Sequence, residues 1–369
     1  MSRFEGLTPE GRVMTEGASA ARAYLELTKP KVVVLLQITA LCAVLSHDLL
    51  EFGSPSKIIW LDTMETMCVV FIGGYLTAGG ANAINMWYDR DIDPIMQRTA
   101  KRPIPSGDIS PTNALLFGLM ISILGVIWFI QFGNQVAALW AGFSIIFYVF
   151  VYTIWLKRSS VQNIVIGGLA GATPPVIGWA TAVGDLKIET SNFQEFFNSI
   201  FDLNSLMPWY LLLLIFFWTP PHFWALALYR SEEYDAVGIP MMPGVKGPER
   251  TLLEMKIYST LLVLLSFAAP AAIGGLDNTD IIYHVFGWTT VIVSIWYTRT
   301  IFMIDPYEPR SESGRIPSAA HSFFISMVYL ALMFAVVVTA SIGLEGSILG
   351  AILATVVIIN YEIKPSPLP

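Results

Sequence analysis

The chain has 369 residues, of which 54% are hydrophobic and 13% are charged, with a net charge of -7. The charged share is about half of the ~25% typical of soluble domains, which excludes an ordinary soluble globular protein. The composition predicts a polytopic membrane protein, organised by the bilayer and not by one aqueous core. The two cysteines, Cys42 and Cys68, lie in apolar runs without metal-site spacing, and we expect two buried thiols.

Residues 1–29 contain no apolar segment typical of a secretory signal peptide, and their glutamates dilute the arginines that a transit peptide needs. We therefore expect a prokaryotic cell membrane as the location. The predicted organisation is a cytoplasmic segment 1–29, a membrane domain 30–342, and a C-terminal segment 343–369 that is apolar and then polar.

Nine apolar runs are long enough to cross ~30 Å of hydrocarbon as helices, and they predict an all-α fold. The runs are 30–50, 65–86, 113–132, 135–155, 162–183, 207–228, 253–275, 281–302 and 320–342. A shorter run, 347–359, either extends the last helix or lies in the membrane interface, and the sequence leaves both interpretations open.

The distribution of Lys and Arg predicts the orientation. With the N-terminus in the cytoplasm and nine crossings, 18 of the 21 basic residues fall on the inner side. The three outer ones are Lys57, Lys187 and Lys364. Basic residues concentrate in cytoplasmic loops, so this split supports both the direction and the number of helices.

The long outer connection 184–206 carries a possible amphipathic helix. Its apolar residues Phe193, Phe196, Phe197 and Ile200 have the i, i+3, i+4, i+7 spacing of one helical face. A short helix on the outer membrane surface and a plain loop are both compatible with this pattern.

An acidic cluster follows the second apolar run. Asn85, Asp89 and Asp93 have i, i+4, i+8 spacing and share one face of a helix, from which Asp91 points away. Pro94 ends the regular helix near Asp93. Two carboxylates and an amide oxygen on one face suit Mg²⁺, which takes few protein oxygens together with water and substrate phosphate. The alternative is a solvated charged loop, which the shared face does not favour.

A basic run comes directly after the acidic cluster. Arg98 and Arg102 have the planar, forked donors that bind diphosphate oxygens, and Lys101 adds a point charge. For Lys101, a topological role as a cytoplasmic cation is an equally good interpretation. The run predicts a diphosphate-binding loop beside the metal.

A second polar constellation lies at the end of the sixth run, where His222 is followed by a face of tyrosine, arginine and glutamates. A histidine inside a membrane helix indicates function, although an interhelical hydrogen bond or a polar cap near Pro220 and Pro221 would also explain it. The candidate residues here are His222, Tyr229, Arg230, Glu232 and Glu233, with Lys246 able to reach phosphate from the same loop.

The third candidate site is the inner loop before the fifth run. Lys157 is either an interfacial anchor or a phosphate ligand, and both interpretations stay open. The glycines that follow permit close helix packing, and Pro174 and Pro175 predict a kink.

These motifs resemble the UbiA-type intramembrane prenyltransferase superfamily, over residues 24 to 342. The segments that carry the resemblance are Leu27–Pro30, Asn85–Asp93, Arg98–Thr99, Arg102–Pro103, Asn163–Gly168, Pro174–Pro175, Thr219–Arg230 and Gly238–Pro243. The acidic motif is typical of the superfamily as a whole. The Thr-Pro-Pro-His-Phe-Trp stretch from Thr219 resembles the family of protoheme IX farnesyltransferases (heme O synthases).

The resemblance implies nine transmembrane helices around a central cavity, and Mg²⁺ bridging Asn85, Asp89 and Asp93 to farnesyl diphosphate. It further implies that diphosphate departs, that a vinyl group of heme B attacks the allylic cation, and that water completes the product, heme O. Arg98 and Arg102 would bind the diphosphate. A downstream heme-modifying enzyme is implied as a partner, and no nucleic acid is expected.

The second motif departs from the superfamily pattern, because His222 stands near a position where many members have aspartate. His222 is therefore a candidate to contact heme iron. Three alternatives remain: a prenyltransferase with an aromatic quinone-precursor acceptor, an ion or proton transporter, and a heme chaperone without catalysis. A transporter predicts acids at mid-membrane, whereas these acids lie at one boundary.

Overall fold

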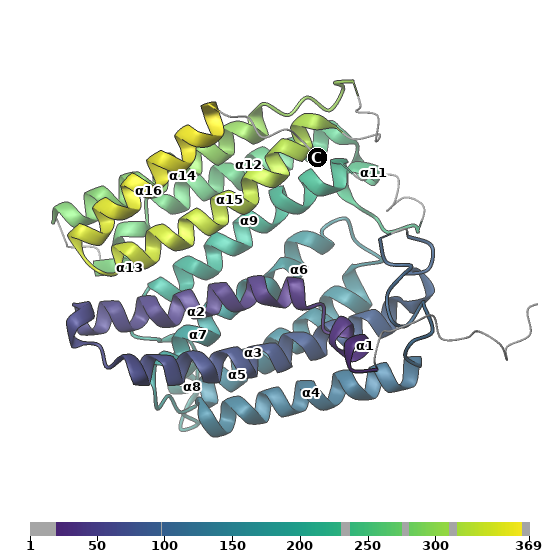
Figure 1. Cartoon of the computed structure of the whole chain (residues 1–369), viewed down its shortest axis with the longest axis horizontal. Helices are drawn as coiled ribbons and strands as arrows, with labels where there is room; N and C mark the ends of the chain where they lie inside the picture. The colour runs from purple at the N-terminus through teal and green to yellow at the C-terminus, as the bar shows by residue number, and fades with distance from the viewer. Residues whose placement is uncertain (1–19, 97, 230–236, 275–279, 310–315, 364–369) are drawn as a thin grey trace, which may run out of the picture.

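The computed structural model describes residues 20–96, 98–229, 237–274, 280–309 and 316–363 (Figure 1). These residues form helices and connecting loops, with no strand among them. The helices that build the bundle are α2 (Pro30–Phe52), α3 (Trp60–Tyr88), α4 (Pro111–Phe132), α5 (Gln135–Ile146), α6 (Asn163–Ala172), α7 (Pro174–Val183), α9 (Met207–Tyr229), α12 (Pro248–Ser266), α14 (Ile281–Phe302), α15 (Pro317–Ala340) and α16 (Leu344–Ile363).

Shorter elements connect the long helices. They are α1 (Ala20–Leu27), the 3-10 turns η1 (Pro55–Lys57) and η2 (Asp89–Asp91), the π-helical segment η3 (Phe147–Leu156), α8 (Phe193–Phe201), α11 (Met242–Lys246) and α13 (Ala269–Gly274). The segment η3 continues α5, and α6 continues into α7 at Pro174, where the sequence predicts a kink.

Nine of the described helical segments are long and apolar enough to cross a membrane, which confirms an all-helical membrane fold. Eight of them correspond to predicted runs. The predicted run 253–275 differs, since α12 ends at Ser266 and a break separates it from α13. The first half of α12 also carries Glu249, Arg250, Glu254 and Lys256, so α12 is more polar than the nine crossing segments.

The ninth crossing segment is α16, which settles the two interpretations of the run 347–359. It is neither an extension of α15 nor an interfacial segment, because the chain reverses at Gly343 and α16 packs back along α14 and α15 (Figure 1). Near its end, Glu362 accepts hydrogen bonds from Arg299 (2.9 Å) and Trp296 Nε1 (3.1 Å) of α14. The described chain therefore ends beside the C-terminal end of α14, and not at the opposite end as nine alternating runs would require.

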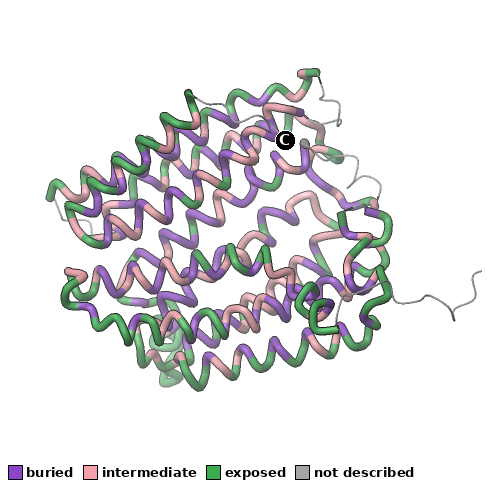
Figure 2. The backbone as a smooth tube through the Cα atoms, viewed as in Figure 1, coloured by how far each residue is buried: buried purple, intermediate pink, exposed green. Residues whose placement is uncertain are grey.

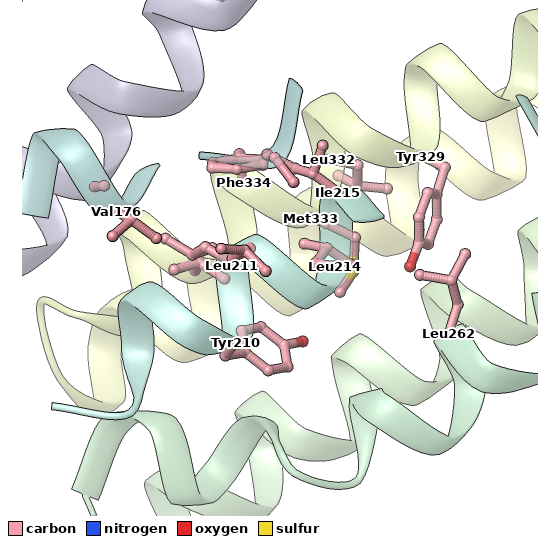
Figure 3. Close-up of a cluster of buried hydrophobic side chains, with 14 of the residues drawn as sticks. Val176, Tyr210, Leu211, Leu214, Ile215, Leu262, Tyr329, Leu332, Met333 and Phe334 are labelled. Carbon is pink, nitrogen blue, oxygen red and sulfur yellow. The ribbon is translucent and has the colours of Figure 1, made fainter. Parts of the chain in front are cut away.

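Apolar side chains from α7, α9, α14 and α15, among other helices, form the largest buried cluster. Figure 2 marks the buried residues along the backbone in purple. In Figure 3, Leu211 and Leu214 of α9 lie among Leu332 and Met333 of α15. At Gly178 the backbones of α7 and α2 approach so closely that a Cβ atom would lie 2.3 Å from the Ala40 carbonyl oxygen. A glycine is therefore required at this helix crossing.

Two smaller expectations can be compared with the structure. The connection 184–206 does contain a helix, α8, whose start is capped by Asn192 and whose Phe193, Phe196 and Phe197 are exposed. The expectation of two buried thiols is wrong, because Cys68 is exposed and Cys42 is half-buried. In a membrane bundle the outer face of a helix is also apolar, so an apolar run does not distinguish interior from lipid-facing positions.

Candidate active site

The acidic motif lies at the C-terminal end of α3, and we call this end of the bundle the acidic end. The continuous helix expected from Asn85 to Asp93 is not formed, since α3 ends at Tyr88 and η2 follows. The Asp93 N–H still donates to the Asp89 carbonyl (2.9 Å), so the turn repeats locally. Asn85, Asp89 and Asp93 are buried (3%, 0% and 2% exposed), whereas Asp91 is exposed, as expected of the opposite face.

Asn85 is held by two partners from distant segments. Lys29 Nζ donates to Asn85 Oδ1 (2.6 Å), and Asn85 Nδ2 donates to Thr153 Oγ1 (3.0 Å). Lys29 immediately precedes α2 and has a left-handed backbone (φ 53°) before Pro30. Burial lowers the pKa of Lys29 well below its ordinary value, and repulsion from Arg102 and Lys157 lowers it further. The amide oxygen of Asn85 thus points at the Lys29 amino group.

Asp89 is fully buried and pairs with Lys157 through Oδ2. Its other oxygen, Oδ1, has no hydrogen-bond partner among the described residues, and Arg158 Nη2 lies 3.6 Å from it. A buried carboxylate oxygen without a partner is energetically costly, so this atom is a candidate ligand for a cation.

The other two carboxylates of the motif have separate arginine partners. Arg102 Nη1 donates to both oxygens of Asp93 (2.8 and 2.9 Å). Arg158 binds both oxygens of Asp91 (2.7 Å each) and stacks over the Tyr88 ring (4.7 Å). The hydrogen bonds to Asp91 raise the pKa of Arg158. Every acid of the motif is therefore paired with a basic side chain.

The π-helical segment η3 brings Thr153 and Lys157 to the end of α3. Its wide turns are marked by Thr153 Oγ1 donating to the Tyr148 carbonyl (2.9 Å) and Lys157 N–H donating to the Tyr152 carbonyl (2.8 Å). Each bond spans five residues, which shifts the register relative to an α-helix. The segment thereby directs Thr153 at Asn85 and Lys157 at Asp89.

The remaining predicted phosphate ligands are not part of this cluster. Arg98, Lys101 and Lys246 are exposed, and none has an ion-pair or hydrogen-bond partner within the described part of the chain. Arg230, Glu232 and Glu233 lie outside the described residues, as does the side chain of Tyr229, which ends α9. The predicted second acidic face is thus described only at its first residue, His222.

His222 lies in α9, five residues before Ala227, which packs with Ile164 of α6 and Ile92 of the acidic loop. At ~1.5 Å rise per residue, His222 lies roughly 7–8 Å deeper along the helix than this contact. Its ring is stacked between Trp218 (4.2 Å between centroids) and Phe323 (4.7 Å). Its Nδ1 atom lies 2.6 Å from Ser326 Oγ of α15.

The donor set at the acidic end fits a hard divalent cation. No group of three or more His, Cys, Asp or Glu residues gathers at a metal-binding distance in the described ranges. Asp89 and Asp93 with the amide oxygen of Asn85 offer a small all-oxygen set, and Asp89 Oδ1 is unpartnered. Such a set suits Mg²⁺ that shares its coordination with phosphate and water.

Comparison with known proteins identifies the family. Residues 38–328 match the model of the UbiA prenyltransferase family. The chain belongs to the UbiA prenyltransferase family. The predicted superfamily and the enzyme class, a prenyltransferase, are thereby confirmed.

Curated relatives in this family are similar over almost their whole length. The protoheme IX farnesyltransferase of Bartonella henselae is 41% identical, with 85% of this chain and 88% of that protein covered. Proteins of the same name from Rhodopseudomonas palustris and Symbiobacterium thermophilum are 38% and 36% identical. They cover 85% and 88% of this chain, and 88% and 97% of their own length.

Solved structures share the fold at lower sequence identity. A digeranylgeranylglyceryl phosphate synthase has a TM-score of 0.63 at 18% identity, covering 88% of this chain and 99% of that one. A UbiA homolog from Archaeoglobus fulgidus, bound to GPP and Mg²⁺, has a TM-score of 0.52 at 19% identity, covering 85% and 99%. These similarities confirm the predicted UbiA-type helical fold.

Sequence reasoning did not single out three side chains that the family fold brings to the motif: Lys29, Thr153 and Arg158. Lys29 stands in the Leu27–Pro30 segment that carries part of the family resemblance, and Arg158 is the neighbour of Lys157. The sequence motifs therefore already contained or adjoined Lys29 and Arg158. Thr153 had no signal, because its position depends on the π-helical register of η3.

Proposed function

We propose that the protein transfers a farnesyl group from farnesyl diphosphate to a vinyl group of heme B, giving heme O, in an Mg²⁺-dependent reaction. The observation that carries the proposal is the acidic end, where two buried carboxylates and an amide meet Lys29, Arg102, Lys157 and Arg158. The names of relatives 36–41% identical supply the acceptor, and a fold neighbour solved with GPP and Mg²⁺ supports the donor class.

In this proposal Asn85, Asp89 and Asp93 hold the metal. Bound Mg²⁺ would neutralise the charge that develops on the departing diphosphate. Lys157 and Arg102 neutralise the two carboxylates in the structure described here, and they lie where they can turn to phosphate oxygens when the metal replaces them.

Basic side chains outside the cluster around Asp89 would bind the remaining diphosphate oxygens. Arg98, Lys101 and Lys246 are exposed and are proposed to bind an incoming anion, and Arg230 is proposed for the same role. Tyr229, Glu232 and Glu233 complete the proposed second acidic face. Their roles are proposed from the sequence motif alone.

The acceptor would lie against the apolar and aromatic wall that contains His222. An allylic cation needs surroundings without water, and the stacked rings of Trp218 and Phe323 beside His222 provide apolar surface. We assign His222 as the residue that contacts the heme. Replacing His222 by Ala should weaken heme B binding and alter its Soret spectrum.

We place the acidic end on the cytoplasmic face of a prokaryotic cell membrane. The support is the concentration of Lys and Arg in the segments at this end. Membrane-impermeant labelling of single cysteines introduced at Lys101 and Lys57 tests this: the former should be protected in sealed right-side-out vesicles and the latter labelled.

The decisive experiment incubates purified protein with heme B, farnesyl diphosphate and Mg²⁺, followed by mass spectrometry. The expected product is the hydroxyethylfarnesyl heme, formed only when the metal is present. Turnover of an aromatic acid acceptor without any farnesylated heme would contradict the proposal.

A further inference from the structure

The contacts of His222 determine which of its two ring nitrogens carries the proton. Helices α9 and α15 meet at this ring, where Trp218 and His222 of α9 face Phe323 and Ser326 of α15. Trp218 Nε1 also donates to the Ser326 carbonyl (2.8 Å). The ring is stacked on both faces, so it cannot rotate without separating the two helices.

The hydroxyl of Ser326 has one proton and three neighbours, of which the Tyr297 hydroxyl is one. Its Oγ lies 2.5 Å from the Phe323 carbonyl oxygen and 2.6 Å from His222 Nδ1. A carbonyl oxygen has no proton to give, so two oxygens this close require the serine proton between them. Ser326 therefore donates to its own helix, a common arrangement for serine in a helix.

The serine oxygen must then accept from His222. With the only hydroxyl proton directed at Phe323, the short contact to Nδ1 is a hydrogen bond only if Nδ1 carries a proton. No described carboxylate contacts His222, and the residue is 8% exposed. A second ring proton would place an uncompensated charge inside the bundle, which is costly. The ring is thus the neutral Nδ1–H tautomer.

The other ring nitrogen, Nε2, keeps its lone pair. It makes no hydrogen bond to any residue in the described ranges. A neutral imidazole with an unprotonated Nε2 is the form that binds a metal porphyrin, and the partner of the other nitrogen sets its orientation and basicity.

We infer that Ser326 is a positioning residue that fixes His222 as the Nδ1–H tautomer and so presents Nε2 as an electron-pair donor to the iron of the porphyrin acceptor. This inference rests on the proposed function, because it gives His222 the acceptor as its ligand. It adds a residue of α15 to the acceptor site, 104 positions from His222 in the chain.

The first test observes the tautomer directly, without turnover. The full-length protein is labelled with ¹⁵N at histidine, and the signals of His222 among the four histidines are assigned by their loss in His222→Gln. We expect a protonated Nδ1 and an unprotonated Nε2 in the parent protein. Ser326→Ala should populate the Nε2–H form, whereas Ser326→Thr, which keeps a hydroxyl, should retain the parent pattern. A protonated Nε2 in the parent protein would overturn the inference.

The second test measures ferric heme B affinity by Soret titration in the same variants. Ser326→Ala should bind heme about tenfold or more weakly, as is usual when the partner of a ligating histidine is removed. Ser326→Thr should bind like the parent. The matched control is Ser322→Ala, one turn away on α15, equally buried but hydrogen-bonded to Thr300 (3.1 Å) and not to His222. Equal heme affinity in Ser326→Ala and Ser322→Ala would contradict the positioning role.

The two tests separate this inference from the proposed function. If the parent protein has the Nδ1–H tautomer but neither binds nor farnesylates heme B, the proposed acceptor is wrong and the role of Ser326 falls with it. If heme B is farnesylated normally by a folded Ser326→Ala protein with parent-like affinity, only the role of Ser326 is wrong.

Discussion

Replacing Lys157 by Met should change metal and diphosphate binding in opposite directions. In the structure, Lys157 neutralises Asp89, whose side chain is fully buried, while its own side chain is 16% exposed. Mg²⁺ can reach Asp89 only by displacing this ammonium group. The variant removes the competitor for the metal and, under the proposed function, also removes a ligand for diphosphate.

The size of the effect follows from the burial of the pair. Removing one partner of a buried ion pair leaves a charge whose cost is about 3–5 kcal/mol. Arg158 remains 3.6 Å from Asp89 and compensates part of it. A bound Mg²⁺ ion that offsets about 1.4–2.8 kcal/mol of the remaining cost of the Asp89 charge would bind roughly 10- to 100-fold more tightly. This is the expected gain of Lys157→Met over the parent for Mg²⁺ without diphosphate.

Isothermal titration of the detergent-solubilised protein with Mg²⁺ alone, with inorganic diphosphate alone and with both measures these affinities. In the parent, each ligand should strengthen binding of the other, and the two coupling factors must be equal. Lys157→Met should bind diphosphate more weakly and lose part of the coupling. Lys57→Met, at an exposed position on the opposite end, is the control. Unchanged or weaker Mg²⁺ binding in Lys157→Met would refute the reasoning.

Three further substitutions, two of them paired with a control variant, test the site and the fold. Asp89→Asn should abolish turnover while the protein stays folded. Asp91→Asn should retain at least a tenth of the activity, because Asp91 is exposed. Farnesyl transfer assays measure the activity of both variants, and size-exclusion chromatography checks their folding. Asn134→Ala should lower stability by about 1–3 kcal/mol in thermal unfolding, since its side chain caps α5 and donates to the Ala180 carbonyl, and an unchanged midpoint would contradict this. Gly178→Ala should cost about 1–3 kcal/mol by the same measurement, whereas Gly171→Ala, with no atom within 4 Å of an added Cβ, should be neutral; equal effects would argue against the close helix crossing.

Local patterns in the sequence were sufficient to predict the class of fold and the position of the motif. Hydropathy over about 20 residues depends only on neighbouring side chains, and it located eight of the nine described crossing segments. It did not predict the break between α12 and α13, nor the separate helix α16. The separate helix α16 depends on the reversal of the chain at Gly343.

The i, i+4, i+8 spacing assigned Asn85, Asp89 and Asp93 to one helical face, and all three are buried, although the helix itself ends at Tyr88. The spacing survives because one turn of backbone hydrogen bonding continues from Asp89 to Asp93. The same pattern also separated Asp91 from the other two acids. The sequence by itself therefore determined which acids form the motif.

Only the tertiary structure decided what pairs with these groups. Lys29 meets Asn85 across 56 positions, Arg158 meets Asp91 across 67, and Ser326 meets His222 across 104. Such contacts depend on how helices cross and on the π-helical register of η3, and no local pattern encodes either of them. The acidic motif after α3 was thus determined by sequence, while the counter-charges Lys29, Lys157 and Arg158 and the proton position on His222 were determined by helix packing.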